Sequence, residues 1–370
     1  MTPFTPQNDP LLRIMRDIRC AAGWQEAEWD PVIRLARVAN VLARLAEDLD
    51  QAGLLEQVPN APRAHLAAAR MLGQRQRLAG LTEIDRVRQA LATSSLPTVL
   101  LKGAAYLAAG LPLSRGRMFG DIDLLFHRED LPEAEAALAL HGWTGGAVSV
   151  YDQRYYREWM HELPPLTHMR RESVLDVHHN ILPLTARRPP DPRLLMDRAI
   201  ELDSMPGVFV LCPADMVLHS ACHLFHEGEL DNGLRDLSDL DRLLRDFGSK
   251  EGFWGELEER AGLLHLELPL HYAVGMCTAL LGTPLPSELK VHVGARRTPV
   301  MDALYLRALR ANHPLANDRW TPLARWLLYV RAHWLRMPPH LLTMHLARKA
   351  WLRASGLSDQ VPDAPPRQQA

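Results

Sequence analysis

Residues 117–126 read RMFGDIDLLF, and two aspartates interrupt this otherwise apolar stretch. Side chains of a β-strand alternate between its two faces, so Asp121 and Asp123 share one face while Ile122 and Leu124 share the other. The apolar face suits a hydrophobic core. Two adjacent carboxylates repel each other unless a cation lies between them, and aspartate is disfavoured in strands. The pattern therefore favours a metal-binding strand over a strand end with a solvated acidic face.

A third aspartate lies in a similar context downstream. Residues 173–181 read SVLDVHHNI, in which Asp176 is flanked by residues typical of strands. If this strand neighbours the first one, three carboxylates can hold two Mg²⁺ ions about 3.5–4 Å apart, an arrangement that suits in-line displacement at phosphorus. Asp176 can also align or deprotonate an acceptor hydroxyl. The alternative is an edge-strand residue paired with Arg170 or Arg171.

The segment upstream of RMFGDIDLLF has features of an anion-binding turn. Residues 100–107 read LLKGAAYL, which predicts a strand, a turn at Gly103 and then a helix. Glycine lets a ligand approach the backbone closely, and the N–H groups at a helix N-terminus attract phosphate. Lys102, Arg115 and Arg117 would add positive charge to such a site. Surface ion pairs are the alternative role for Lys102 and Arg117.

The composition restricts the class of protein. The chain has 370 residues, 47% of them hydrophobic and 23% charged, as in globular proteins of one large domain or two to three ordinary ones. The net charge of −2 gives no global basic field, so we expect no sequence-specific nucleic-acid partner. Four cysteines without CxxC spacing argue against a disulfide framework or a zinc ribbon and favour the cytoplasm. We read no signal peptide and no transmembrane run in the sequence.

Periodic patterns predict an α+β fold, with a small mixed β-sheet core flanked by largely helical N- and C-terminal regions. Asp-Pro pairs at 9–10 and 30–31 each predict a helix start, with aspartate as the N-cap and proline in the first turn. The middle block reads as strand–helix–strand–helix–hairpin. The patterns divide the chain into helical residues 1–95, mixed residues 96–211, helical residues 212–355 and a Pro- and Gln-rich, disordered tail at 356–370.

Residues 98–180, which carry these motifs, resemble the uncharacterised nucleotidyltransferase family of the polymerase-β-type nucleotidyltransferase superfamily. The similar features are the LKG turn, an arginine shortly before DIDLL and a later strand that carries aspartate and histidine. The resemblance extends more weakly through residues 218–226 and 234–244. It implies that residues 96–211 form a mixed-sheet catalytic core. The core would use Mg²⁺ to transfer a nucleoside monophosphate from an NTP, with ATP as the default, to a hydroxyl acceptor that the sequence does not identify.

The resemblance also implies roles for individual residues. Asp121, Asp123 and Asp176 would be the catalytic residues and would hold the metal, with two Mg²⁺ ions expected. Nucleotide binding would fall to residues of the turn and of the two strands, namely Lys102, Gly103, Ala104, Arg117 and His178. A packed strand histidine is the alternative for His178.

The chain departs from the superfamily pattern in two ways. Ala104 stands where a small polar residue or a second glycine is usual, so no hydroxyl is available there. The spacing from Gly103 to Asp121 is also long. These departures keep a second interpretation open, that of a catalytically inactive protein derived from the same fold that senses nucleotides.

Three further features admit two interpretations each. His219, His223 and His226 share one helical face at a spacing that can bind a transition metal, as in a hydrolase, but a polar core is favoured. Arg235 can reach a phosphate, but pairing with an aspartate of its own helix is favoured. Residues 319–353 contain seven Lys or Arg, four Trp and no acidic residue. This composition suits weak peripheral membrane contact by an assembly protein, although packing of the tryptophans into the core is favoured.

Overall fold

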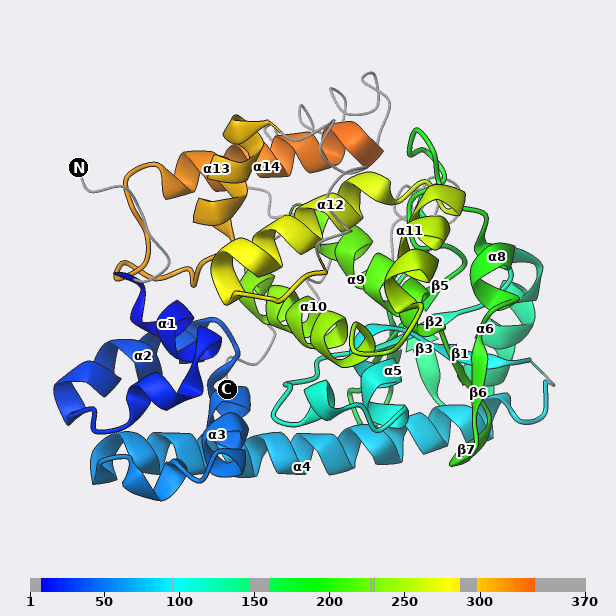
Figure 1. Cartoon of the computed structure of the whole chain (residues 1–370). Helices are drawn as coiled ribbons and strands as arrows, with labels where there is room; N and C mark the ends of the chain where they lie inside the picture. The colour runs from blue at the N-terminus through cyan, green and yellow to red at the C-terminus, as the bar shows by residue number, and fades with distance from the viewer. Residues whose placement is uncertain are drawn as a thin grey trace, which may run out of the picture. The chain divides into compact units, whose positions relative to one another are not determined.

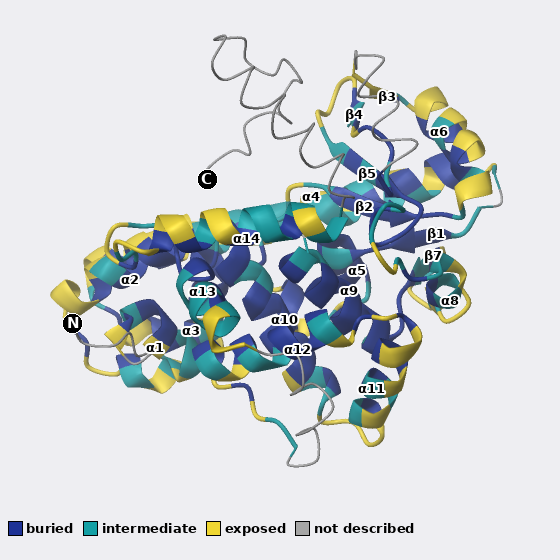
Figure 2. Ribbon diagram, turned by 90° about the horizontal axis from the view of Figure 1, so that it is seen from above, coloured by how far each residue is buried: buried dark blue, intermediate teal, exposed yellow. Residues whose placement is uncertain are grey.

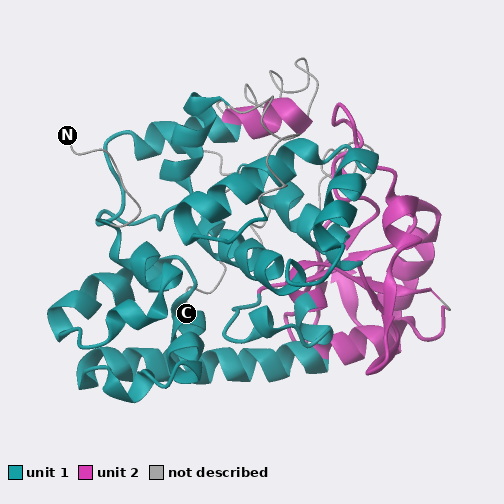
Figure 3. Cartoon of the chain, viewed as in Figure 1, with its two compact units in different colours: residues 1–82, 106–119, 212–329 teal, residues 83–105, 120–211, 330–370 magenta. Residues whose placement is uncertain are grey.

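The chain folds into two compact units, each assembled from three separate segments (Figure 3). Unit 1 comprises residues 1–82, 106–119 and 212–329, and unit 2 comprises residues 83–105, 120–211 and 330–370. The predicted tail at 356–370 and residues 337–353 of the basic segment lie outside the described residues. The computed structural model describes residues 8–94, 96–146, 160–226, 228, 230–286 and 298–336.

The described part of unit 2 contains a seven-stranded mixed β-sheet with the strand order β3-β4-β5-β2-β1-β7-β6 (Figure 1). The strands are β1 (Thr98–Leu100), β2 (Ile122–Leu125), β3 (Trp143–Gly145), β4 (Leu166–His168), β5 (Val174–His178), β6 (Ile200–Leu202) and β7 (Met205–Val210). Strand β2 lies in the middle of the sheet, parallel to β5 and antiparallel to β1, while β1 is parallel to β7. With its helical flanks, this mixed sheet confirms the predicted α+β fold.

Strand β2 is buried along its whole length (Figure 2). Ile122 and Leu124 contribute to the core as the alternation of faces predicts. Asp123 lies on the other face, but its exposed fraction is only 3%, so that face is covered at this position rather than open. Because a buried carboxylate is costly unless it is paired, the contacts of Asp123 define what this part of the sheet can do.

Short helices of unit 2 follow its strands in the predicted order. Strand β1 leads directly into α5 (Lys102–Ala108), and β2 leads through a 3₁₀ turn, η5 (Arg128–Asp130), into α6 (Leu131–Leu140), which packs against β3. Strands β4 and β5 form the predicted hairpin, and Glu172 has a left-handed φ of 59° in the connection. A last short helix, α8 (Pro192–Met196), precedes the β6–β7 hairpin.

Unit 1 is helical. Helix α9 lies at its centre, because most of its residues are buried and it contacts α10, α11 and α12. Among the described residues, no helix combines the length and the apolar character that crossing a membrane requires. The elements of unit 1 are α1 (Pro10–Arg16), η2 (Ile18–Ala21), α2 (Glu26–Val38), α3 (Leu42–Gln51), η3 (Leu55–Gln57), most of α4 (Asn60–Leu91), the end of α5, η4 (Pro112–Ser114), α9 (Pro213–His226), α10 (Gly233–Phe247), α11 (Phe253–Leu263), α12 (Glu267–Met276), the π-helical turn η7 (Cys277–Leu281), α13 (Pro299–Ala308) and the first part of α14 (Thr321–Arg336).

Of the two helix starts predicted from Asp-Pro pairs in unit 1, one is confirmed and one is wrong. Asp9 is the N-cap of α1 and accepts hydrogen bonds from two backbone N–H groups of the first turn, as predicted. The helix start predicted at 30–31 is wrong, since α2 begins five residues before Pro31 and includes it. A reciprocal cap between Gln25 and Glu28 starts the helix earlier. The first turn then buries Trp29, so packing outweighs the start signal of the Asp-Pro pair.

Candidate active site

The structure places the three predicted aspartates on, or directly before, two neighbouring strands of unit 2. Strands β2 and β5 are parallel, and Asp123 is the register partner of Asp176. Asp121 directly precedes β2 and, two residues before Asp123, belongs to the same face of the strand. The backbone N–H of Leu101 donates to the carbonyl of Asp123 at 3.0 Å, which ties this position to the end of β1. Backbone hydrogen bonding therefore fixes the main-chain positions from which the carboxylate side chains extend.

Asp123 has two partners on one carboxylate oxygen. Lys102 Nζ lies 2.9 Å from Asp123 Oδ1, and His178 Nε2 lies 3.1 Å from the same atom. Burial alone would raise the pKa of Asp123, but the Lys102 ammonium and the His178 hydrogen bond hold this pKa well below its ordinary value. Burial would likewise lower the pKa of His178, but Asp123 and Glu162 raise it. Asp123 is therefore an ionised carboxylate held in place by cationic neighbours.

The electrostatic environment of Asp176 is opposite to that of Asp123, although the two residues are register partners. Burial, together with the negative charges of Asp123, Asp121 and Glu162, raises the pKa of Asp176 to about 8. His178 offsets only part of this effect. A carboxyl group that is dehydrated and surrounded by anions becomes stable as an anion when a cation binds next to it. The electrostatics and the all-oxygen donor set therefore fit a divalent metal such as Mg²⁺.

The LKG turn joins β1 to α5 beside these carboxylates. Lys102 has a φ of 46°, a left-handed conformation that is uncommon for a residue other than glycine. Gly103 and Ala104 follow in the first turn of α5, and both are buried. A strained backbone at Lys102 persists only where the surroundings stabilise it, and the ion pair with Asp123 is one such contact. The turn thus directs the lysine ammonium to the carboxylate site.

A family model described as uncharacterised nucleotidyltransferase matches residues 25–282, more than half of the chain. The chain belongs to this nucleotidyltransferase family. The matched residues include the whole β-sheet, the LKG turn and all three aspartates. Family membership supports a general role in nucleotidyl transfer. No curated protein and no solved structure matches the chain.

Arg117 of this nucleotidyltransferase-family chain belongs to unit 1, whereas the three aspartates belong to unit 2. Its Nε donates to Asp239 Oδ2 at 2.8 Å, and Arg44 Nη2 lies 2.5 Å from the other oxygen of Asp239. The Arg117 guanidinium also lies over the rings of Tyr106 and Phe119. Burial would raise the pKa of Asp239, but Arg117 and Arg44 hold it below its ordinary value. Arg117 is thus part of a buried ion-pair network, and nucleotide binding by this residue stays a prediction.

Two residues that the sequence motifs did not single out lie next to His178. Glu162 forms an isolated β-bridge with His178, and Glu162 Oε2 lies 3.4 Å from His178 Nδ1. The ring of His161 stacks on that of His178, with centroids 5.4 Å apart. The contact continues the antiparallel pairing of the β4–β5 hairpin beyond β4, and the only local signal was the His-Glu pair itself.

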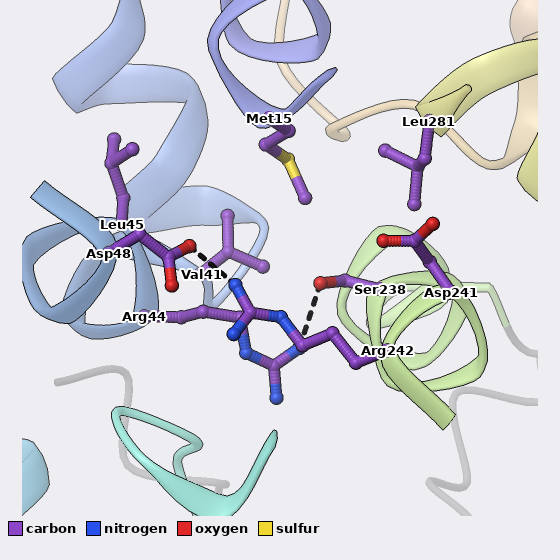
Figure 4. Close-up of a pocket in the computed structure, with 9 residues that line it drawn as sticks. All are labelled: Met15, Val41, Arg44, Leu45, Asp48, Ser238, Asp241, Arg242 and Leu281. Carbon is purple, nitrogen blue, oxygen red and sulfur yellow. Dashed lines mark hydrogen bonds and ion pairs between the residues drawn. The ribbon is translucent and has the colours of Figure 1, made fainter. Parts of the chain in front are cut away.

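The other candidate groups lie in unit 1. Arg235 pairs with the adjacent Asp236 at 2.8 Å, which agrees with the favoured pairing within one helix. His219 is buried on α9. Among the described residues, the α9 histidines belong to no group of three ligand atoms that lie within 4.8 Å of one another. A small pocket near α3 and α10 is lined by Asp48 and Arg242 (Figure 4). These two residues form an ion pair with each other, so they stabilise the helix contact and we assign the pocket no function.

The described part of the basic segment exposes its tryptophans. Trp320, Trp326 and Trp334, at and within α14, have exposed fractions of 46%, 59% and 47%. The prediction that the tryptophans of this segment pack into the core is therefore wrong for these three. Trp351 lies outside the described residues. The exposed rings accompany an all-basic set of charges between residues 319 and 336.

Proposed function

We propose that this protein transfers a nucleoside monophosphate from a nucleoside triphosphate to a hydroxyl acceptor in an Mg²⁺-dependent reaction, with ATP as the first candidate donor. The observation that carries the proposal is the β2–β5 register, which pairs Asp123 with Asp176 next to Asp121. Carboxylate oxygens are ligands that Mg²⁺ prefers, and the raised pKa of Asp176 reflects its burial and the negative charges of Asp123, Asp121 and Glu162. Family membership supports the same class of reaction.

In this reaction the acceptor oxygen bonds to the α-phosphorus, the bond between that phosphorus and the pyrophosphate oxygen breaks, and the acceptor loses its proton. Mg²⁺ held by Asp121, Asp123 and Asp176, with two ions expected, would neutralise the charge that develops on pyrophosphate. Asp176 aligns the acceptor hydroxyl and accepts its proton, because it is the less buried of the two paired aspartates. Asp123 keeps its negative charge throughout, since Lys102 stabilises the anion.

The residues of the LKG turn bind the triphosphate in this proposal. Lys102 is the best supported of them, because its ammonium already lies beside the carboxylate that would hold the metal. Gly103 and Ala104 would contribute backbone N–H groups at the start of α5. His178 orients Asp123 through their hydrogen bond. The proposal does not use Arg117, whose guanidinium is bound to Asp239.

Pyrophosphate release tests the proposal. The full chain is incubated with Mg²⁺, each of the four NTPs and a panel of acceptors that includes small sugars, hydroxyl-bearing antibiotics and proteins. We expect release that requires Mg²⁺ and is lost in Asp123→Asn but kept in Asp197→Asn, a change at an exposed aspartate of the same unit. Tight Mg²⁺-NTP binding without release for any acceptor would instead favour the nucleotide-sensing alternative.

A second candidate function is peripheral membrane contact through α14. Exposed tryptophans beside arginines, without acidic residues, suit the surface of an anionic bilayer. Flotation with vesicles that contain an anionic lipid tests it. We expect the wild-type chain to float and the Trp320→Ser/Trp326→Ser variant to remain at the bottom of the gradient. Equal flotation of both, or none with the wild type, would reject this function without affecting the proposed transfer reaction.

A further inference from the structure

Residues 160–163 lie alongside the end of β5 in unit 2, where backbone hydrogen bonds hold them. The N–H of Leu163 donates to the carbonyl of Val177 at 2.8 Å, and the N–H of His179 donates to the carbonyl of His161 at 2.8 Å. These bonds enclose the bridge between Glu162 and His178. The positions of the three side chains discussed next are therefore set by paired backbone, not by a loop that is free to move.

The side chains of His161, Glu162 and His178 gather at this bridge. One nitrogen or oxygen ligand atom from each lies within 4.8 Å of the other two. The two histidines are 7% and 4% exposed, and the Glu162 side chain is 25% exposed. Ligands of a zinc-sized ion lie about 2.0–2.2 Å from it and hence roughly 3.5 Å from one another. Small side-chain rotations would bring the three atoms to that spacing.

We infer that His161, Glu162 and His178 form a binding site for one divalent transition metal ion of the zinc class. Two imidazoles and a carboxylate are a common ligand set for such ions when a fourth position is left for water or substrate. Mg²⁺ prefers oxygen ligands alone. This site is therefore chemically distinct from the aspartate site, and it does not rest on the proposed transfer reaction.

His178 connects the inferred metal site to Asp123. Its Nε2 lies 3.1 Å from Asp123 Oδ1, and its Nδ1 faces Glu162. Because ionised Asp123 can only accept, Nε2 carries a proton towards it, and Nδ1 is the nitrogen that would bind a metal, which displaces any proton held there. Histidines that bind a metal usually donate their other N–H to a carboxylate in this way, which fixes the ring and its tautomer. A metal at Nδ1 would thus hold Asp123 in a fixed orientation.

The first test measures zinc binding by the unmodified full chain. Zn²⁺ is titrated in the presence of a large excess of Mg²⁺, and the bound ion is examined by X-ray absorption. We expect one tightly bound Zn²⁺ with two imidazole nitrogens and at least one oxygen among its ligands. A shell of oxygens only, or no binding once Mg²⁺ is in excess, would overturn the inference.

The second test removes one ligand at a time. His161→Gln and Glu162→Gln should each lower Zn²⁺ affinity on the order of 100-fold or more, since loss of a mere supporting contact already costs about 10–100-fold. The control, His141→Gln, removes an exposed histidine of the same unit and should leave affinity unchanged. Thermal unfolding identifies any variant that fails to fold. If His161→Gln does not fold, the Zn²⁺ affinity of Glu162→Gln, a change at a partly exposed residue, is the deciding measurement. Unchanged Zn²⁺ affinity in folded Glu162→Gln would contradict the site.

Mg²⁺-dependent NTP binding, measured on the same proteins, separates this inference from the proposed function. We expect His161→Gln to lose zinc affinity while keeping Mg²⁺-dependent NTP binding. Loss of NTP binding in His161→Gln with unchanged zinc affinity would overturn the inferred site and leave the proposed function standing.

Discussion

Asp123 and Asp176 are register partners on the parallel strands β2 and β5, yet their carboxyl groups lie in opposite electrostatic environments. The pKa of Asp123 lies well below the ordinary value because Lys102 and His178 outweigh its burial. The pKa of Asp176 rises to about 8 because burial combines with the charges of Asp123 and Asp121. Pairs of carboxyl groups whose environments separate their pKa values are typical of sites that do chemistry. The predictions below follow from this relationship and from the network around Asp239.

Replacing Asp123 should abolish the transfer reaction. In Asp123→Asn the carboxylate that would hold Mg²⁺ is lost, and with it the stabilisation of transition-state charge by the metal. Because this stabilisation amounts to several kcal/mol, we expect kcat to fall by at least about 100-fold. The rate of pyrophosphate release measures this effect, with Asp197→Asn as the control. Turnover within a few-fold of the wild type in Asp123→Asn would show that this residue is not a metal ligand.

Replacing Asp176 should stabilise the metal-free protein while stopping turnover. Asp176→Asn removes a dehydrated carboxyl group that the neighbouring anions destabilise, so we expect the free energy of unfolding to rise by roughly 1–3 kcal/mol. Denaturant unfolding in the presence of a chelator measures the change. A less stable Asp176→Asn protein would contradict the environment described for this residue.

The stabilisation by Asp176→Asn should depend on pH. The folded chain binds the Asp176 proton more tightly than the unfolded chain does, so this group lowers stability progressively as pH rises from its ordinary pKa of 3.8 to about 8. Asparagine does not titrate. The difference in unfolding free energy between variant and wild type should therefore increase with pH and level off above about 8. A difference that is constant across this range would reject the raised pKa.

The buried network around Asp239 should be essential for the stability of unit 1. Asp239→Asn leaves Arg44 and Arg117 buried without their carboxylate, and breaking such a pair costs about 3–5 kcal/mol. Asp236→Asn, at a more exposed pair with Arg235, should cost no more than about 1 kcal/mol. Because the pKa of Asp239 is lowered, its contribution is present above the ordinary value of 3.8 and is lost as pH falls through the lower folded pKa. Equal effects of the two variants on urea unfolding would refute this role.

Lys102 should show separate backbone and charge effects. Its φ of 46° favours glycine, so the free energy of unfolding of Lys102→Gly should be about 1 kcal/mol higher than that of Lys102→Ala. Both variants lose the ammonium and should raise the KM for the NTP by roughly 10–100-fold, as expected for a hydrogen bond to a charged group. Lys102→Arg, which keeps the charge, should retain more of the affinity. Identical KM values for all four proteins would exclude phosphate binding by Lys102.

The sequence predicts the order of elements and the carboxylate face well, because both depend on local periodicity. The alternation in IDLL and the strand pattern around Asp176 are properties of neighbouring residues. By contrast, the pairing of Arg117 with Asp239 joins positions 122 residues apart, and the stacking of His161 on His178 depends on how the three-dimensional fold places the two rings. No local pattern encodes such contacts. The early start of α2 and the exposed Trp326 show the same limit, since packing decides both.

Mg²⁺-dependent binding of a non-hydrolysable ATP analogue tests the central claim most directly, since it needs no knowledge of the acceptor. Calorimetric titrations compare the wild type, Asp123→Asn and Asp197→Asn, each with Mg²⁺ and with a chelator. The account predicts binding to the wild type and to Asp197→Asn only when Mg²⁺ is present, and loss of that binding in Asp123→Asn. Binding that ignores Mg²⁺, or that survives unchanged in Asp123→Asn, would contradict the assignment of the paired aspartates as the metal and nucleotide site.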